Sequence, residues 1–253
     1  MCHPAPPLVE YLFIDEPRLR SYAEQLEISR SVDKIPSWNV KLSIKGPDVA
    51  ATQDNKLRPA TAHEMITKLI RSLRKNDQLE IERAHVETKY QFAFEETVAQ
   101  KVLLPLKEAK RVKELKDIAV WVSNPSTKPH LPTEESTRVP KGTFLYLLEA
   151  YWESDDLLHG PFSGFSALNL ILSEVADVMG LNRETVLTKY EARRSFKSPL
   201  ATLQEIGGIP QDQRRIQTLY RKRYISDDQY VLIDGASRRY YDLFAYPIYI
   251  ASV

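Results

Sequence analysis

The C-terminal part of the sequence combines arginine and tyrosine in a pattern typical of anion binding. Seven of the 13 tyrosines lie between residues 220 and 249, interleaved with arginines. Guanidinium groups bind phosphate and carboxylate oxygens, and aromatic faces stack on planar rings. We therefore predict a site for a nucleotide or another small anion that includes Arg221, Arg223, Tyr224, Arg238 and Arg239. The structural alternative is that tyrosine is favoured in strands and arginine covers sheet faces.

A second candidate is the loop HGPFSGFSA at residues 159–167, which places small residues before an expected helix. Backbone amides at a helix start bind anions, so His159, Ser163 and Ser166 join the predicted ligand site. Hydrolysis is an alternative, with Ser166 as nucleophile and His159 as its base. However, this loop lacks the second glycine of a nucleophile elbow, and Ser166 is also explained as the N-cap of the helix.

The segment ADVMGLNRETV has the spacing of a helix-turn-helix unit. Its small residue, turn glycine and apolar contact are Ala176, Gly180 and Val186. In this alternative the protein is a DNA-binding regulator that uses residues 175–190, and the residues facing the groove are Asn182, Arg183, Thr185 and Lys189. Two core helices joined by a glycine C-cap and an asparagine N-cap have the same pattern. The formal net charge of +1 gives no general attraction to nucleic acid, so we favour the small ligand.

Other candidates for catalysis or metal binding have structural explanations. His63 and Glu64 resemble the start of a zinc-protease helix, but position 67 is threonine. The five histidines do not cluster along the sequence, and Cys2 is the single cysteine. With 8 glycines, the chain has no phosphate-binding loop of standard spacing. We therefore predict no catalytic residues, no metal and no cofactor, and we favour a non-enzymatic binding or sensor module.

Composition predicts an ordinary globular protein, with 253 residues, 43% hydrophobic and 27% charged. The longest late apolar run, AYPIYIASV, is too short to cross a bilayer. The opening segment has no basic region of the kind that starts a signal peptide. We therefore expect a cytoplasmic protein without membrane contact. Its partner is a small anion or another protein, and the oligomeric state is left open.

Hydrophobic spacing predicts the elements that position these residues. Thr61 and Glu64 form a capping box before a helix over residues 62–75, and an apolar helix at 167–179 should be central. Alternating or apolar segments predict strands at 8–14, 38–44, 86–94, 117–123 and 143–152, followed by a β-rich tail with Asp234-Gly235 as a hairpin turn. Pro247 predicts an edge or a bulge in the last strand, and an edge would be open to pairing with another chain.

These elements predict an α+β fold, in which a mixed or mostly antiparallel sheet packs with three to four helices. We expect a single domain over residues 1–253. The segment at 124–142 contains four prolines and has no apolar period, which indicates a long surface loop. A division into two lobes, 8–123 and 143–253, joined by this loop, is the alternative.

The segment YLFIDEPRLRSYAEQL resembles the start of a poorly characterised bacterial family of unknown function. Members begin with an apolar strand, an aspartate and a helix that carries Leu, Ser-Tyr and Gln. The matching positions here are Ile14, Asp15, Leu19, Ser21, Tyr22 and Gln25. Such domains often occur near anti-phage and conflict genes, so the resemblance implies a sensing or interaction role in bacterial defence or regulation. It includes no catalytic motif.

Overall fold

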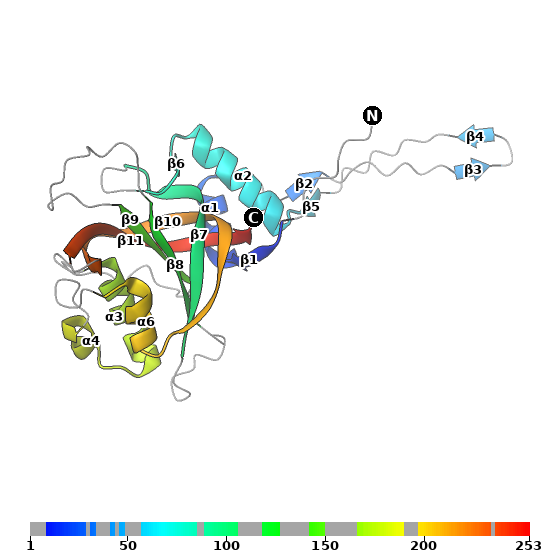
Figure 1. Cartoon of the computed structure of the whole chain (residues 1–253). Coiled ribbons are helices and arrows are strands. Elements are labelled where there is room, and N and C mark those ends of the chain that lie inside the picture. The colour runs from blue at the N-terminus through cyan, green and yellow to red at the C-terminus, as the bar shows by residue number, and fades with distance from the viewer. Residues whose placement is uncertain are drawn as a thin grey trace. The chain divides into compact units, whose positions relative to one another are not determined.

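The computed structural model describes residues 9–28, 31–33, 41–43, 46–48, 57–84, 89–105, 118–126, 142–149, 166–189, 197–233 and 236–253 (Figure 1). Contacts divide the chain into two units, one formed by residues 1–15 and 78–253 and the other by residues 16–77. This is not the division considered at residues 124–142. The strands on either side of that segment, β8 (Ile118–Ser126) and β9 (Thr143–Glu149), pair directly with each other.

The larger unit is built on a closed barrel of five strands: β7 (Phe92–Leu104), β8, β9, β10 (Ile209–Ile233) and β11 (Ala236–Ser252). Four of the pairings, β7–β8, β8–β9, β10–β11 and β7–β10, are antiparallel. The ring is closed by a parallel pairing between β9 and β11. Two short strands extend it, β1 (Tyr11–Ile14) beside β11 and β6 (Leu79–Ile81) beside β7.

The prediction of an α+β sheet packed with three to four helices is therefore wrong. Closure joins Leu145 of β9 to Leu243 of β11, residues whose numbers differ by 98. It also needs long, bent strands, and the β10–β11 pair contains three register shifts. A period-two pattern shows that a segment is a strand, but it does not show that the first and last strands of a sheet meet.

Alternate residues of the barrel strands point to opposite faces. One set fills the interior with a mixture of small and large side chains: Ala93, Ala99, Trp121, Leu145, Leu147, Ile216, Tyr220, Leu243 and Ala245. The opposite set on β8, β9 and β11 packs on the outside against α3 (Ala167–Met179) and α6 (Pro199–Glu205). The helices therefore cover one flank of the barrel (Figure 1).

The predicted helix at 167–179 is α3, and it is buried as expected for a central helix. It ends at Gly180, whose φ is +69°, and the Leu181 N–H donates to the Ala176 carbonyl at 2.8 Å. The next helix, α4 (Arg183–Lys189), begins with the Asn182 side chain accepting from the Thr185 N–H at 2.9 Å. The predicted glycine stop and asparagine cap are therefore confirmed.

The smaller unit contains α1 (Glu16–Gln25), α2 (Ala62–Lys75) and two short antiparallel pairs. The pairs are β2 (Ser31–Asp33) with β5 (Leu57–Pro59), and β3 (Lys41–Ser43) with β4 (Gly46–Asp48). α2 has its predicted bounds. The predicted capping box is confirmed, since the Thr61 N–H donates to Glu64 Oε2 at 2.8 Å and the Glu64 N–H donates to Thr61 Oγ1 at 3.3 Å.

The C-terminal tail forms the β10–β11 hairpin. Ile233 pairs with Ala236, which is the register of a two-residue connection, while Asp234 and Gly235 themselves lie outside the described residues. Pro247 lies at a register shift, because Tyr220 pairs with Pro247 and Leu219 with Tyr249. The predicted bulge is confirmed.

An edge at Pro247 is not what the structure shows. β11 pairs with β9 as far as Ala245, and the Asp15 N–H donates to the Ile248 carbonyl at 2.9 Å where β1 begins to pair. A residue without an N–H thus lies where β11 changes neighbours. Among the described helices, none is long and apolar enough to cross a membrane.

Candidate ligand-binding site

The structure does not bring the predicted tail residues together. Arg221, Arg223 and Tyr224 lie in the middle of β10, whereas Arg238 and Arg239 lie near the hairpin end of β11, where Arg239 pairs with Tyr230. The nine positions from residue 221 to residue 230 span about 30 Å along a strand. Tyr224 also packs against the apolar cluster beneath α3. The arginine- and tyrosine-rich tail is therefore a long hairpin, not one binding surface.

Of the three site residues predicted in the loop at 159–167, one is described by the structure. His159 and Ser163 lie outside the described residues, and Ser166 is 1% exposed. Its Oγ accepts from the Asn169 N–H at 3.1 Å, so the N-cap explanation of Ser166 is confirmed.

The start of α3 is also held by a carboxylate that the sequence patterns did not indicate. The Leu168 N–H donates to Asp242 Oδ2 at 3.3 Å, and the Ser226 hydroxyl donates to Asp242 Oδ1 at 2.7 Å. Asp242 is fully buried. The chain's own carboxylate therefore occupies the position where an external anion would bind the first turn of α3.

The helix-turn-helix alternative is not favoured by the packing of α3 and α4. Val175 and Ala176 are fully buried against the barrel, and Val186 of α4 joins the same cluster. A DNA-binding pair presents its first helix across the nucleic-acid backbone, at the protein surface. Arg183 is exposed, but the Lys189 ammonium lies 3.0 Å from Glu205 of α6. Core packing and capping thus account for the motif.

The order of the barrel strands is one found in proteins that bind nucleic acid on the outer face of the barrel. Counted along the chain, neighbouring strands follow the order 1-2-3-5-4-1, with the third parallel to the fifth, as in the OB-fold. OB-folds bind oligonucleotides on the face of strands 2 and 3. Here the outward residues of those strands, Val120, Val122, Tyr146 and Leu148, are at most 4% exposed in the cluster with α3 and α6. This face is not open to nucleic acid.

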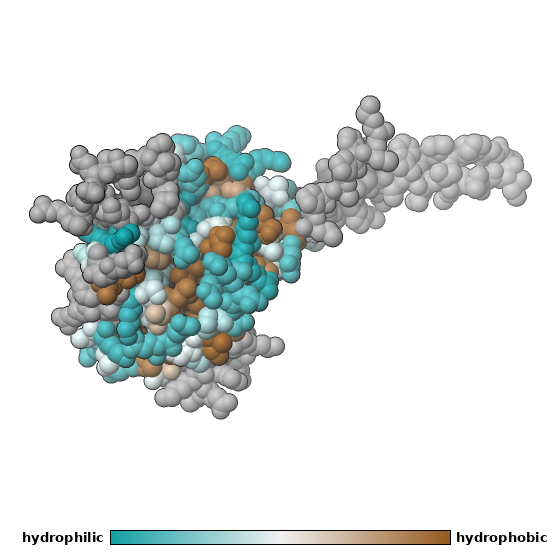
Figure 2. Space-filling model, in the orientation of Figure 1, coloured by the Kyte–Doolittle hydropathy of each residue, from teal (hydrophilic) through white to brown (hydrophobic). Residues whose placement is uncertain are grey.

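The outer face of β7 and β10 is exposed, and its polar side chains bond to one another. Arg215 Nη2 lies 3.3 Å from Glu96 Oε2, and the Gln217 amide donates to Glu96 Oε1 at 3.2 Å. Figure 2 shows hydrophilic and apolar residues mixed over the surface of the larger unit. Val98 of β7 and Ile209 of β10 are exposed apolar residues. The charge of Arg215 is thus balanced locally by Glu96.

A cavity of about 230 Å³ lies between the start of α6 and the helix-covered flank of the barrel. Its walls are mainly apolar and are formed by Val122, Phe144, Pro199, Leu200, Val231 and Tyr240. The rings of Phe144 and Tyr240 meet edge to face, with centroids 5.2 Å apart and planes at 67°. Such a pair presents ring faces and edges to a planar ligand.

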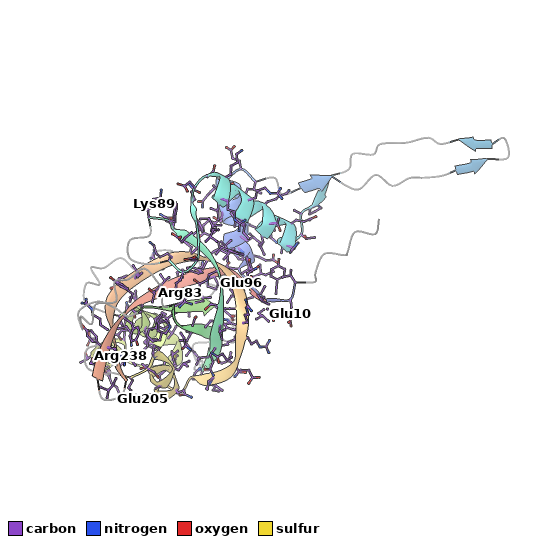
Figure 3. The ribbon with its side chains drawn as sticks, turned by 45° about the horizontal axis from the view of Figure 1, so that its top comes forward. Glu10, Arg83, Lys89, Glu96, Glu205 and Arg238 are labelled. Atoms are coloured by element: carbon purple, nitrogen blue, oxygen red, sulfur yellow. The ribbon has the colours of Figure 1, made fainter. Side chains whose placement is uncertain are left out.

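Strand register places Arg238 beside this cavity. Arg238 is directly opposite Val231 in the β10–β11 pair and two residues before Tyr240, so all three side chains leave the same face of the hairpin. Arg238 is exposed, and it forms no ion pair in the part of the chain that the structure describes. Figure 3 labels it at the end of the hairpin. The Arg238 side chain therefore leaves the hairpin on the same face as two residues that line the cavity, Val231 and Tyr240.

Arg238 belongs to the predicted ligand set and is directly opposite a residue that lines the cavity, Val231. The lining residues were not among the sequence candidates, since residues 122, 144, 199 and 231 come from separate elements. Within the described residues, no group of three or more His, Cys, Asp or Glu side chains is placed to hold a metal ion. The chemistry available at the cavity is ring contact, hydrogen bonding and anion recognition.

No protein-family model matches the chain, and no curated protein or solved structure matches it. The family resemblance of residues 11–26 therefore stays a prediction.

Proposed function

We propose that the protein is a non-enzymatic binding or sensor module for a small anionic ligand, and that the cavity beside Arg238 is its binding site. The observation that supports this is the register of the β10–β11 hairpin, which sets Arg238 opposite Val231 and on the same face as Tyr240. An apolar cavity with a few polar groups is the usual form of a small-molecule site. A guanidinium binds a carboxylate or phosphate through two parallel hydrogen bonds.

The volume of the cavity limits the size of the ligand that it can hold. A dry apolar cavity of about 150 Å³ binds benzene, and pockets for drug-sized ligands occupy about 300–1,000 Å³. A volume of about 230 Å³ therefore suits one ring system. The acidic group of the ligand would lie outside the cavity, at the Arg238 guanidinium, because none of the described residues that line the cavity is charged.

The biological setting in the proposal comes from the resemblance of residues 11–26, which implies bacterial defence or regulation. A phage-challenge assay of bacteria that express the chain, or the Arg238→Gln variant, tests this setting. Protection that is lost in the variant would support it, and equal plating efficiency with and without the chain would contradict it.

Binding itself is tested by thermal unfolding of the full chain with nucleotides, cyclic nucleotides and simple aromatic acids. A ligand present at 100 times its Kd is expected to stabilise the fold by about 2.7 kcal/mol. Arg238→Gln should weaken binding of an anionic ligand. Arg214→Gln, at an exposed arginine of β10 outside the cavity lining, is the matched control and should bind normally. No stabilisation by any compound, or equal loss in both variants, would contradict the proposal.

A further inference from the structure

We propose that the ligand is a nucleoside monophosphate, with its base in the cavity and its phosphate on Arg238. This inference rests on the proposed function and narrows it from small anions in general to one chemical class. Three features carry it: the volume of the cavity, the hydrogen-bonding groups in its lining, and the Arg238 guanidinium on the strand position opposite the lining residue Val231.

The cavity has the dimensions and walls of a site for one base. About 230 Å³ exceeds the roughly 150 Å³ that holds benzene, and it is below the range of sites for larger ligands. Phe144 and Tyr240 provide aromatic walls, and Val122, Val231 and Leu200 close the remainder. Every base has π-faces that stack on aromatic side chains, so these walls accept a purine or a pyrimidine.

The polar groups in the lining suit the edge of a base better than a plain aromatic ring. The side-chain amide of Asn124 and the hydroxyl of Tyr240 have no hydrogen-bond partner in the described part of the chain. Ser198 Oγ accepts from the Ala201 N–H at 3.3 Å, which leaves its hydroxyl hydrogen to donate. An asparagine amide offers two donors and an acceptor, the combination that matches base edges. A ligand without such an edge leaves these groups unused.

The backbone of Asn124 is held from within the barrel. Its carbonyl accepts from Arg83 Nη1 at 2.6 Å, and the Arg83 side chain is 5% exposed. Asn124 is also an exposed residue, and it is among the residues that line the cavity. This residue therefore presents its amide from a fixed backbone, and replacing the side chain leaves the backbone hydrogen bond in place.

The charges favour one phosphate. Arg238 is directly opposite the lining residue Val231, and the described residues that line the cavity include no lysine or arginine. A triphosphate would need further cations or a metal ion. Two residues along a strand span about 7 Å, so Arg238 and Tyr240 are separated by roughly the width of a ribose. Within the described part of the lining, no acidic side chain is present to repel a phosphate.

The test is titration calorimetry on the full chain with the four ribonucleoside monophosphates, their nucleosides, ribose 5-phosphate and benzoate. We expect at least one monophosphate to bind ten-fold or more tightly than its nucleoside, and tighter than ribose 5-phosphate or benzoate. Arg238→Gln should remove the preference for the monophosphate over the nucleoside. Asn124→Ala should weaken the binding of both the monophosphate and the nucleoside about five-fold or more and leave the binding of benzoate unchanged. Arg214→Gln should leave the binding of every compound unchanged.

The outcomes separate this inference from the proposed function. If benzoate binds as tightly as every monophosphate, the cavity is a site for small acids and the nucleotide assignment is overturned. If a nucleoside binds as tightly as its monophosphate, the role of Arg238 as the phosphate ligand is overturned. If no compound binds, both the inference and the proposed function fail. Arg238 and Asn124 are exposed, so the variants should fold, and matching circular dichroism spectra would establish this.

Discussion

Arg83 and Glu95 form an ion pair inside the barrel, with Nη2 3.0 Å from Oε1 and each side chain 5% exposed. Arg83 follows β6, and Glu95 lies on the interior face of β7. The guanidinium also donates to two hydroxyls and two backbone carbonyls, those of Thr97, Ser123, Asn124 and Thr143. One buried arginine thus connects β7, β8 and β9 and uses its hydrogen-bonding capacity within the fold.

Removing one member of this pair should be strongly destabilising. Arg83→Met leaves the Glu95 carboxylate buried without its cation, which typically costs about 3–5 kcal/mol of unfolding free energy. The double variant Arg83→Met, Glu95→Leu should lose less unfolding free energy than the two single variants lose in sum. Urea denaturation measures each value.

An exposed ion pair provides the control for this experiment. Arg20 and Glu16 lie 2.7 Å apart, with side chains 58% and 55% exposed, so Arg20→Met should cost at most about 0.5 kcal/mol. Similar losses in Arg83→Met and Arg20→Met would contradict the role assigned to the buried pair.

Two fully buried tyrosines should respond differently to loss of the hydroxyl. Tyr220 accepts from the Ala84 N–H at 3.2 Å and donates to Glu95 Oε2 at 3.3 Å, so Tyr220→Phe should cost about 1–3 kcal/mol. The Tyr146 hydroxyl has no partner among the described residues, and Tyr146→Phe should be neutral or stabilising. Chemical denaturation of both variants compares them directly, and equal losses would be inconsistent with these environments.

The same tyrosines predict how stability depends on pH. Burial is the main cause that raises the pKa of Tyr146 and Tyr220 well above the usual value, and nearby Asp242 and Glu95, respectively, raise it further. The unfolded chain releases these protons near pH 10 whereas the folded chain keeps them. Their contribution is therefore fully present below about pH 10 and falls at higher pH. Unfolding free energies measured from pH 8 to 11 should fall less steeply in Tyr146→Phe, and an unchanged slope would contradict this.

Gly208 should not tolerate a side chain. A Cβ at this position would lie 2.6 Å from the Leu203 carbonyl oxygen and 2.8 Å from Val102 Cγ1. The backbone of α6 cannot shift without breaking its packing, so we expect Gly208→Ala to reduce the free energy of unfolding by about 1–3 kcal/mol. At the neighbouring Gly207 the nearest atom is 3.5 Å away and φ is +95°, so Gly207→Ala should cost about 1–2 kcal/mol through backbone strain alone. Thermal denaturation of both variants tests the close contact, and wild-type stability in Gly208→Ala would refute it.

The packing of α3 and α4 predicts no specific recognition of duplex DNA. Fluorescence anisotropy with a pool of random duplexes at physiological salt should show no binding that depends on Arg183 or Lys189. Arg183→Ala should leave stability unchanged, and Lys189→Ala should remove an exposed contact with Glu205. Tight binding that weakens steeply with salt and is lost in Arg183→Ala would restore the DNA-binding hypothesis.

Local spacing by itself determined the helices α2 and α3 and where each of them begins and ends. The capping box of Thr61 and Glu64, the apolar repeat of α2 and the turn at Gly180 each depend on residues within one or two helical turns, so a linear pattern contains them. The bulge at Pro247 was predictable for the same reason, because the missing N–H is a property of the residue itself.

Only the tertiary structure decided the closed barrel and the site on its flank. β9 pairs with β11 across 98 positions, Asp242 reaches the start of α3, and the cavity takes its walls from β8, β9, β10, β11 and α6. A linear pattern shows which face of its own element a side chain occupies. Which faces meet depends on how far each strand bends and on where the sheet closes, and those follow from the packing of the whole unit.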